Sequence, residues 1–176
     1  MNYADIKYCD VANGEGVRVS LFVSGCTHHC KECFNKEAWD FHYGNPFTQK
    51  EIDRILEYLK PNYIAGLSLL GGEPMEPVNQ EGILPLLRVV KQTNPEKNIW
   101  CYTGYLFDKD VLDKMCKESE VTKEIVSYLD IVVDGEFMID RKNLKINFRG
   151  SDNQRIIDVK KTLDAGEIVH WEREIQ

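Results

Sequence analysis

Residues 17–35, VRVSLFVSGCTHHCKECFN, join an apolar segment to a loop that holds three cysteines. The apolar part, residues 17–25, is rich in β-branched residues and ends on a glycine, which predicts a buried strand. Cys26, Cys30 and Cys33 follow with the spacing C-x₃-C-x₂-C. Three thiols cannot all pair with one another, and a tetrahedral metal site normally uses four ligands. A metal centre at this loop would therefore need a further ligand.

Two kinds of metal centre fit this loop. A zinc site could add His28 or His29 to the three cysteines. Zinc sites usually draw pairs of ligands from separate segments, however, whereas all the candidates here lie in one loop. A [4Fe–4S] cluster suits a short run of thiolates better, with one iron left without a protein ligand. Spacing alone favours iron–sulfur, in which case both histidines are expected to be exposed loop residues.

Composition limits the class of protein. A chain of 176 residues indicates a single domain over residues 1–176, and a net charge of −7 argues against nonspecific binding to nucleic acid or an anionic membrane. The sequence shows no secretory signal, and no apolar stretch approaches the roughly 18–20 residues of a membrane-spanning helix. We therefore expect a cytoplasmic protein with reduced cysteines. Cys9, Cys101 and Cys116 are each expected to be small buried residues.

Strand and helix patterns alternate along the rest of the chain. Beyond the first strand, the patterns predict strands at 63–74, 98–105, 130–137 and within 148–159. They predict helices at 48–60, 81–94, 108–119, 121–129 and 160–166. The helix at 81–94 is expected to be interrupted at Pro85. This alternation predicts an α/β fold of parallel strands joined by crossovers. The repeats are too few for a closed eight-stranded barrel, so we expect an open, partial TIM-like (β/α) barrel with its chemistry at the carboxyl ends of the strands.

The cysteine loop and the GGEP of residues 71–74 together resemble the radical S-adenosylmethionine superfamily. With WCYTGY, VDGEF and RGSDNQRIIDV added, the chain is similar to the glycyl-radical-enzyme activases, and among them to the activating proteins of anaerobic ribonucleoside-triphosphate reductase, from about residue 10 to 159. The resemblance implies a barrel of the radical SAM type. It also implies a [4Fe–4S] cluster on Cys26, Cys30 and Cys33, with S-adenosyl-L-methionine as the ligand of the fourth iron.

The resemblance further implies a reaction. The reduced cluster would cleave S-adenosylmethionine, and the 5′-deoxyadenosyl radical would take a hydrogen atom from a glycine of the anaerobic ribonucleoside-triphosphate reductase. The electron would come from a flavodoxin- or ferredoxin-type donor, and no side chain is expected to act as a general base. The alternatives are an activase of another glycyl-radical enzyme, a radical SAM enzyme acting on a small molecule, and a non-enzymatic zinc-binding interaction module.

The resemblance also points to residues that would contact S-adenosylmethionine. These are Glu32, Cys33, Phe34, Gly71, Gly72, Glu73, Thr103 and Asp134. Much of the superfamily has an aromatic residue before the third cysteine, whereas this chain has Glu32 there and Phe34 after it. Strand-end carbonyls near Glu73 would bind the ammonium group, and Thr103 the ribose or the carboxylate.

Each of these segments also has a simpler interpretation. GGEP can be a plain turn, and YTGY can be a strand end with aromatic packing. Asp134 could bind a ribose hydroxyl, but Asp134–Gly135 is also a strong signal for a hairpin turn. Arg149 and Arg155 could contact a carboxylate or the partner protein, or could be solvated surface charges.

Overall fold

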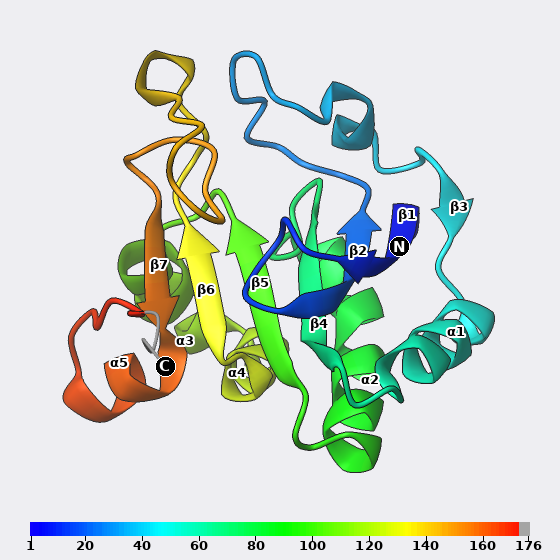
Figure 1. Cartoon of the computed structure of the whole chain (residues 1–176). Coiled ribbons are helices and arrows are strands. Elements are labelled where there is room, and N and C mark those ends of the chain that lie inside the picture. The colour runs from blue at the N-terminus through cyan, green and yellow to red at the C-terminus, as the bar shows by residue number, and fades with distance from the viewer. Residues whose placement is uncertain (173–176) are drawn as a thin grey trace.

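The computed structural model describes residues 1–172, and its centre is a mixed seven-stranded sheet with the order β3-β1-β2-β4-β5-β6-β7 (Figure 1). The strands are β1 (Asn2–Asp10), β2 (Val17–Val23), β3 (Asn45–Pro46), β4 (Ile64–Gly71), β5 (Asn98–Thr103), β6 (Ile131–Asp134) and β7 (Arg155–Asp158). Strands β2, β4, β5 and β6 are parallel, as the sequence predicts. The linear order leaves β3 and β7 as the edges, so the sheet is open.

Three strands depart from the predicted parallel pattern. β7 pairs with β6 in the antiparallel direction, and β1 and β3, which the sequence patterns did not predict, add an antiparallel side to β2. Tyr3 is the one buried residue among the nine of β1, and the sequence NYADIKYCD lacks the apolar run of a buried strand. The hairpin signal at Asp134–Gly135 correctly indicated that the next strand, β7, runs antiparallel to β6. The connection is not a tight turn, however, because residues 135–154 lie between the two strands.

The helices largely follow the predicted segments. They are α1 (Gln49–Leu59), α2 (Pro77–Thr93), α3 (Cys116–Glu118), α4 (Glu120–Tyr128) and α5 (Val159–Ala165), with a π-helical segment η2 (Phe107–Met115) and short 3₁₀ turns η1 (Lys36–Trp39) and η3 (Ile139–Arg141). Among residues 1–172, no helix has the length and apolar character that crossing a membrane requires. The expected interruption at Pro85 is wrong, because α2 continues through it. Pro85 lies on the exposed face, where water can satisfy the freed carbonyl.

Alternate residues of a strand point to opposite faces of the sheet, and the two faces here carry different kinds of side chain. One face carries Val19, Leu21, Leu67 and Leu69, which join the helices in the main hydrophobic core. In Figure 1 the helices α2, α3 and α4 lie behind the sheet on that side. The opposite face carries a smaller cluster around Trp100, together with more polar side chains.

Arg18 is one of these polar side chains and is fully buried. Its Nε donates to Ser68 Oγ at 2.7 Å, and its Nη2 donates to the carbonyl oxygens of Leu67 at 2.9 Å and Asn98 at 3.2 Å. Burial lowers the pKa of Arg18 to about 10, so the guanidinium keeps its charge at neutral pH. The side chain therefore ties β2, β4 and β5 together on the face that the helices leave uncovered.

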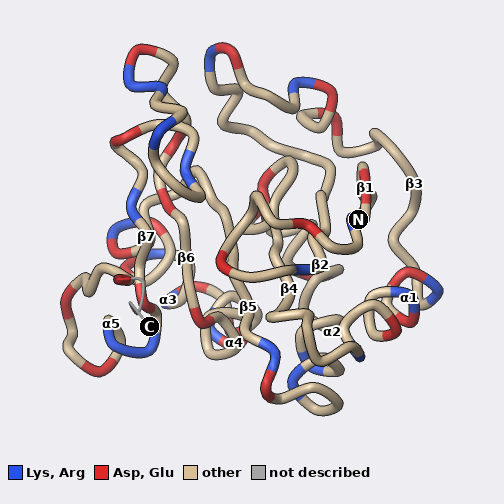
Figure 2. Tube along the Cα trace, viewed as in Figure 1, with Lys and Arg blue, Asp and Glu red and all other residues tan. Residues whose placement is uncertain are grey.

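Two long segments meet at the carboxyl ends of the parallel strands (Figure 1). Residues 24–44 leave β2 and carry the cysteine loop, and residues 135–154 run from β6 to β7. Both segments carry acidic and basic side chains (Figure 2). The edge of the sheet at which the sequence predicts the chemistry is therefore covered by two segments that are far apart in the chain.

The three scattered cysteines do not share one environment. Cys101 is buried on β5, as predicted, and Cys116 is partly buried. The prediction for Cys9 is wrong, because this residue is exposed. It lies in β1 where the pairing with β2 shifts register between Lys7 and Asp10, and its φ is 60°.

A pH-dependent contribution to stability is expected from Asp130. Its Oδ2 accepts from the Ile99 N–H at 2.8 Å and from Lys91 Nζ at 3.0 Å, and its Oδ1 lies 2.7 Å from Lys160 Nζ. Burial raises the pKa of this carboxyl, but these donors outweigh burial and lower it overall. The carboxylate therefore stabilises the fold above its ordinary pKa of about 4, and this stability is lost as the pH falls through the lowered value.

Asp130→Asn should lower the free energy of unfolding at pH 7 by about 1–3 kcal/mol, because the neutral amide loses the charge that faces Lys91 and Lys160 and turns an NH₂ group toward one of the donors. Urea unfolding of the metal-free protein at pH 7, 5 and 3 measures this loss. The difference between variant and wild type should shrink at pH 3. Asp164→Asn, at an exposed position, is the control and should follow the wild type. An Asp130→Asn difference that stays constant with pH would contradict the assignment.

Candidate metal and cofactor site

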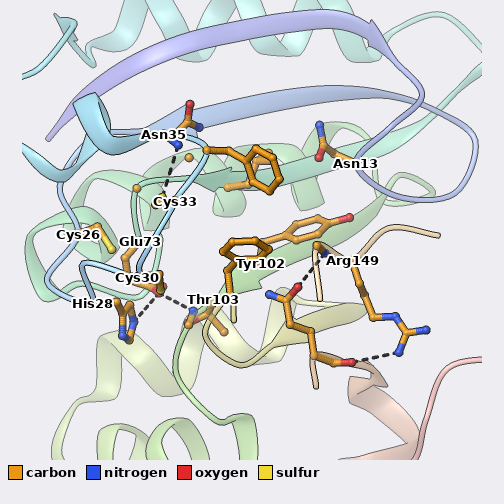
Figure 3. Close-up of a pocket in the computed structure, with 18 of the residues that line it drawn as sticks. Asn13, Cys26, His28, Cys30, Cys33, Asn35, Glu73, Tyr102, Thr103 and Arg149 are labelled. Atoms are coloured by element: carbon orange, nitrogen blue, oxygen red, sulfur yellow. Dashed lines mark hydrogen bonds and ion pairs between the residues drawn. The ribbon is translucent and has the colours of Figure 1, made fainter. Parts of the chain in front are cut away.

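A cavity of about 520 Å³ lies at the carboxyl ends of the parallel strands (Figure 3). Its walls come from the cysteine loop, from the ends of β4 and β5, and from residues 135–154. The predicted site residues in these walls are Cys26, Cys30, Cys33, Phe34, Gly71, Gly72, Glu73 and Thr103. The structure therefore brings most of the predicted site residues around one space.

The cysteine loop reaches this cavity through an unusual backbone. His29 and Glu32 have φ values of 52° and 57°, in the left-handed region that residues other than glycine seldom adopt. These two positions allow the loop to turn so that all three thiols line the cavity. Cys26 is buried, and burial raises the pKa of its thiol to about 11. Burial also raises the pKa of Cys30.

The arrangement of the thiols bears on which metal centre they suit. Among residues 1–172, no three His, Cys, Asp or Glu side chains form a group that could hold a single metal ion. The three cysteines are free and share the cavity wall. An iron–sulfur cluster is wider than one ion and takes each thiolate on a different iron, so its ligands need not converge on one point.

His28 is not the exposed loop residue that the sequence predicts. Its side chain is 10% exposed, and its Nε2 lies 3.0 Å from Glu73 Oε2 and its Nδ1 3.0 Å from Glu136 Oε1. Burial lowers the pKa of His28, but the two carboxylates outweigh burial and raise it to about 9. His28 thus links the cysteine loop to GGEP and to residues 135–154. His29 is exposed, as predicted, and its ring packs on Trp39.

Gly104 of YTGY makes room for this link. A Cβ at Gly104 would lie 2.6 Å from the His28 ring. The Tyr105 ring also packs on the imidazole in an edge-on arrangement, with 4.4 Å between the ring centroids. The Gly104 N–H also donates to Glu73 Oε2 at 2.8 Å. The sequence suggested a strand end or a cofactor contact for YTGY, whereas the structure places a side chain from the distant cysteine loop against this glycine.

The glycines of GGEP allow the backbone of β4 to approach the start of the cysteine loop. The Gly72 N–H donates to the Val23 carbonyl at 2.7 Å, and the Glu73 N–H donates to the Gly25 carbonyl at 2.8 Å. A Cβ at Gly72 would lie 2.5 Å from the Gly25 oxygen. Gly71 has a φ of 109°, which also favours glycine. The segment is therefore more than a plain turn, because it holds the cysteine loop against the sheet.

Two predicted site residues are not in the cavity wall. Glu32 is exposed, and its carboxylate lies 3.7 Å from Lys36 Nζ. Asp134 is fully buried: it accepts from the Phe107 N–H at 2.7 Å and from Arg155 Nε at 2.9 Å. Arg155 also pairs with Asp108 at 2.8 Å and is therefore not a solvated surface charge. The Asp134 carboxylate is thus engaged at the start of η2 and at β7.

The comparisons with known proteins give the chain a family. A family model described as "4Fe-4S single cluster domain" matches residues 12–157. A protein of Pasteurella multocida is 40% identical over 158 residues, which cover 89% of this chain and 96% of that protein. The protein of Enterobacteria phage T4 is 43% identical over 158 residues, covering 89% and 93%, and that of Escherichia coli K12 is 38% identical over 156 residues, covering 88% and 96%.

All three relatives are named anaerobic ribonucleoside-triphosphate reductase-activating protein. The chain belongs to this family. The similarity implied by the cysteine loop and the later motifs is thereby confirmed at the level of the family. The residues lining the cavity run from Ala12 to Gln154 and all fall within the matched range, so the whole cavity belongs to the part of the chain that the 4Fe-4S domain covers.

The contact between GGEP and the cysteine loop predicts a cost for adding one methyl group. Gly72→Ala should lower the free energy of unfolding of the metal-free protein by about 1–3 kcal/mol, since the new Cβ meets backbone oxygens of Gly25 and Ala38 at 2.5 and 2.8 Å. Urea unfolding followed by circular dichroism measures the change.

Glu81→Ala is the control for this variant. Glu81 lies at an exposed position of α2, where alanine is the best helix former. This variant should be at least as stable as the wild type. Equal stability of Gly72→Ala and the wild type would show that the strand end can move away from the cysteine loop without cost.

Proposed function

We propose that this chain activates anaerobic ribonucleoside-triphosphate reductase. A [4Fe–4S] cluster held by Cys26, Cys30 and Cys33 would reductively cleave S-adenosylmethionine, and the 5′-deoxyadenosyl radical would abstract hydrogen from a glycine of the reductase and leave a glycyl radical there. The observation that carries the proposal is the convergence of these three thiols and GGEP on one cavity, in a chain whose relatives are named as activators of that reductase.

The residues present fit both cofactors. Three free thiols with one cavity beside them suit a cluster that keeps one iron open for a small ligand. The cavity of about 520 Å³ is in the size range of small-molecule sites. Backbone groups of Gly71 and Gly72 and the Thr103 side chain would contact S-adenosylmethionine. The Glu73 carboxylate already accepts from the Met75 and Gly104 N–H groups and from His28, so its part is to position these elements.

The chain itself would shield the reaction from water. The Phe34 and Phe137 rings pack at 5.2 Å between centroids, and Lys142 Nζ lies 5.2 Å from the centroid of the Phe34 ring. These residues join the cysteine loop to residues 135–154 over the cavity. His28 joins the same two segments from inside through Glu136. Exclusion of water protects a reactive radical from side reactions.

The proposal includes the fold type and the setting of the reaction. The four parallel strands and the site at their carboxyl ends support a partial barrel of the radical SAM type. A flavodoxin- or ferredoxin-type protein would supply the electron, in the cytoplasm. An open sheet leaves the cavity reachable by a loop of a partner protein.

The alternatives are less well supported. The names of the relatives favour the ribonucleotide reductase over another glycyl-radical enzyme or a small-molecule substrate. A zinc-binding module would need a histidine as the fourth ligand. Both ring nitrogens of His28 are engaged by carboxylates, and the His29 ring packs on Trp39. The geometry therefore favours the iron–sulfur centre over a Cys₃His site.

Anaerobic reconstitution with iron and sulfide, followed by electron paramagnetic resonance of the reduced protein, tests the proposal. We expect a [4Fe–4S]⁺ signal that changes when S-adenosylmethionine is added, and a glycyl doublet when the reductase is added as well. Cys30→Ala should abolish the first signal because one iron loses its thiolate, whereas Cys116→Ala, a cysteine outside the cavity wall, should retain it.

A colourless protein that binds one zinc ion tightly and gives no such signal would overturn the proposal. A normal cluster signal that does not respond to S-adenosylmethionine would retain the iron–sulfur centre but reject the radical mechanism. Loss of the signal in Cys116→Ala as well as in Cys30→Ala would show that the ligand set is wrong.

A further inference from the structure

The cavity has two ends, and the proposed cofactors account for one of them. In Figure 3, Cys26, Cys30, His28 and Glu73 lie together on one side, whereas Arg149 lies on the opposite side, with Tyr102 between. The second end is built on the sheet face that the helices leave uncovered. The cavity is also lined by the apolar side chains of Phe22, Leu70, Ile146 and Phe148, and Asn13 lies near Tyr102 and Arg149 in Figure 3.

Within residues 1–172, two hydrogen-bond donors at this end have no partner. The Tyr102 hydroxyl and Arg149 Nε are buried without a hydrogen bond to any residue of the described part of the chain. Burial raises the pKa of Tyr102, so the phenol keeps its proton and can donate. Buried polar groups in proteins are nearly always paired, and each exception calls for an explanation. Trp39, which also lines the cavity, carries a third such donor among residues 1–172, its indole N–H, so the cavity suits a ligand that offers acceptors.

The surrounding hydrogen bonds hold Arg149 in place. Its Nη1 donates to the Gln154 carbonyl at 3.1 Å. The Gln154 side chain in turn accepts from the Gly150 and Ser151 N–H groups at 2.8 and 3.1 Å, and donates to the Gly135 carbonyl at 2.9 Å. Within the described part of the chain, the buried side-chain atoms of this loop that lack a partner are Arg149 Nε and Asn153 Oδ1. The other hydrogen bonds hold the Arg149 side chain in the wall of the cavity.

The chemistry of the donors limits the occupant. Arg149 Nε can only donate, so the ligand must present an acceptor there, on an otherwise apolar wall. A glycine has no side chain, and a site that selects one glycine of a partner must therefore hold the peptide groups on either side of it. Peptide carbonyls are neutral acceptors on a slim chain and suit such a wall. The carboxylate of S-adenosylmethionine would lie at the other end, on the open iron beside the thiols.

The mouth of the cavity also suits a polypeptide. Phe34 and Leu144 line the cavity and yet are 68% and 84% exposed. Exposed apolar side chains that gather at the edge of a cavity are typical of a surface that binds another chain. Leu144 and Ile146 come from the same segment as Arg149, so the exposed rim continues inward to the unpaired donors.

We propose that the Tyr102–Arg149 end of the cavity receives the glycine-containing segment of the reductase and holds it by its main-chain carbonyls. This inference rests on the proposed function, because it takes the thiol end as the place of S-adenosylmethionine. Tyr102 and Arg149 are then residues that position the protein substrate, separately from those that hold the cofactors.

The test uses the reconstituted holoprotein and one variant for each unpaired donor. Tyr102→Phe deletes only the hydroxyl, whereas Arg149→Lys keeps the charge but replaces the guanidinium, so it also loses the Nη1 bond to the Gln154 carbonyl. Three quantities are measured: binding of the intact reductase to the immobilised holoprotein, methionine release from S-adenosylmethionine with dithionite in the absence of reductase, and the change of the cluster signal on adding S-adenosylmethionine. Tyr128→Phe is the control, because it removes a hydroxyl that bonds to Glu124 on helix α4.

In Tyr102→Phe we expect the dissociation constant for the reductase to rise about tenfold, which corresponds to ~1.4 kcal/mol. Methionine release and the change of the cluster signal on adding S-adenosylmethionine should stay within about twofold of the wild type, the margin expected when no contact to the cofactor is lost. Arg149→Lys should behave in the same way, and Tyr128→Phe should match the wild type in all three measurements.

Three results would overturn the inference. Weaker binding of S-adenosylmethionine in Tyr102→Phe would assign this end to the cofactor. Unchanged reductase binding in both donor variants would show that the donors do not hold the partner, as would failure of the wild type to bind the reductase. If the wild type binds the reductase but releases no methionine, the proposed function fails, and the binding measurements still decide whether this end receives the partner.

Discussion

The architecture of the site depends on one backbone contact, between the end of β4 and the first residues after β2. The Gly72 and Glu73 N–H groups continue the strand pairing onto the Val23 and Gly25 carbonyls, where any side chain on Gly72 would collide with the chain. This contact sets the direction in which the cysteine loop leaves the sheet. Because three thiols must reach one cavity from a single loop, the position of that loop determines whether a cluster can bind.

Side chains from distant segments then complete the enclosure. His28 joins the cysteine loop to Glu73, which follows the end of β4, and to Glu136, on the segment that follows β6. The Phe34–Phe137 pair repeats the connection nearer the surface. On the uncovered face of the sheet, Arg18 ties β2, β4 and β5 through one serine hydroxyl and two carbonyls. The core under the helices is apolar, whereas the face that forms the cavity is held together by hydrogen bonds.

Much of the fold could be predicted from local patterns in the sequence. The four parallel strands have β-branched or apolar runs that end in glycine-containing motifs, and α1 begins where Thr48 and Glu51 form a capping box. β1 was missed because it is little buried and its sequence lacks an apolar run. Pro85 was taken as a break because its exposed position in α2 was not evident from the sequence. Both errors concern solvent exposure, which a one-dimensional pattern does not record.

The sequence by itself determined that one short segment carries three thiols, because Cys26, Cys30 and Cys33 fall within eight residues. Only the tertiary structure decided what the other polar groups do. It paired His28 with Glu136 and buried Asp134 against Arg155. Among the residues that the structure describes, it left the Tyr102 hydroxyl and Arg149 Nε without a partner in one cavity. These outcomes depend on residues far apart in the chain, and the folded backbone brings such residues together in ways that spacing along the sequence does not encode.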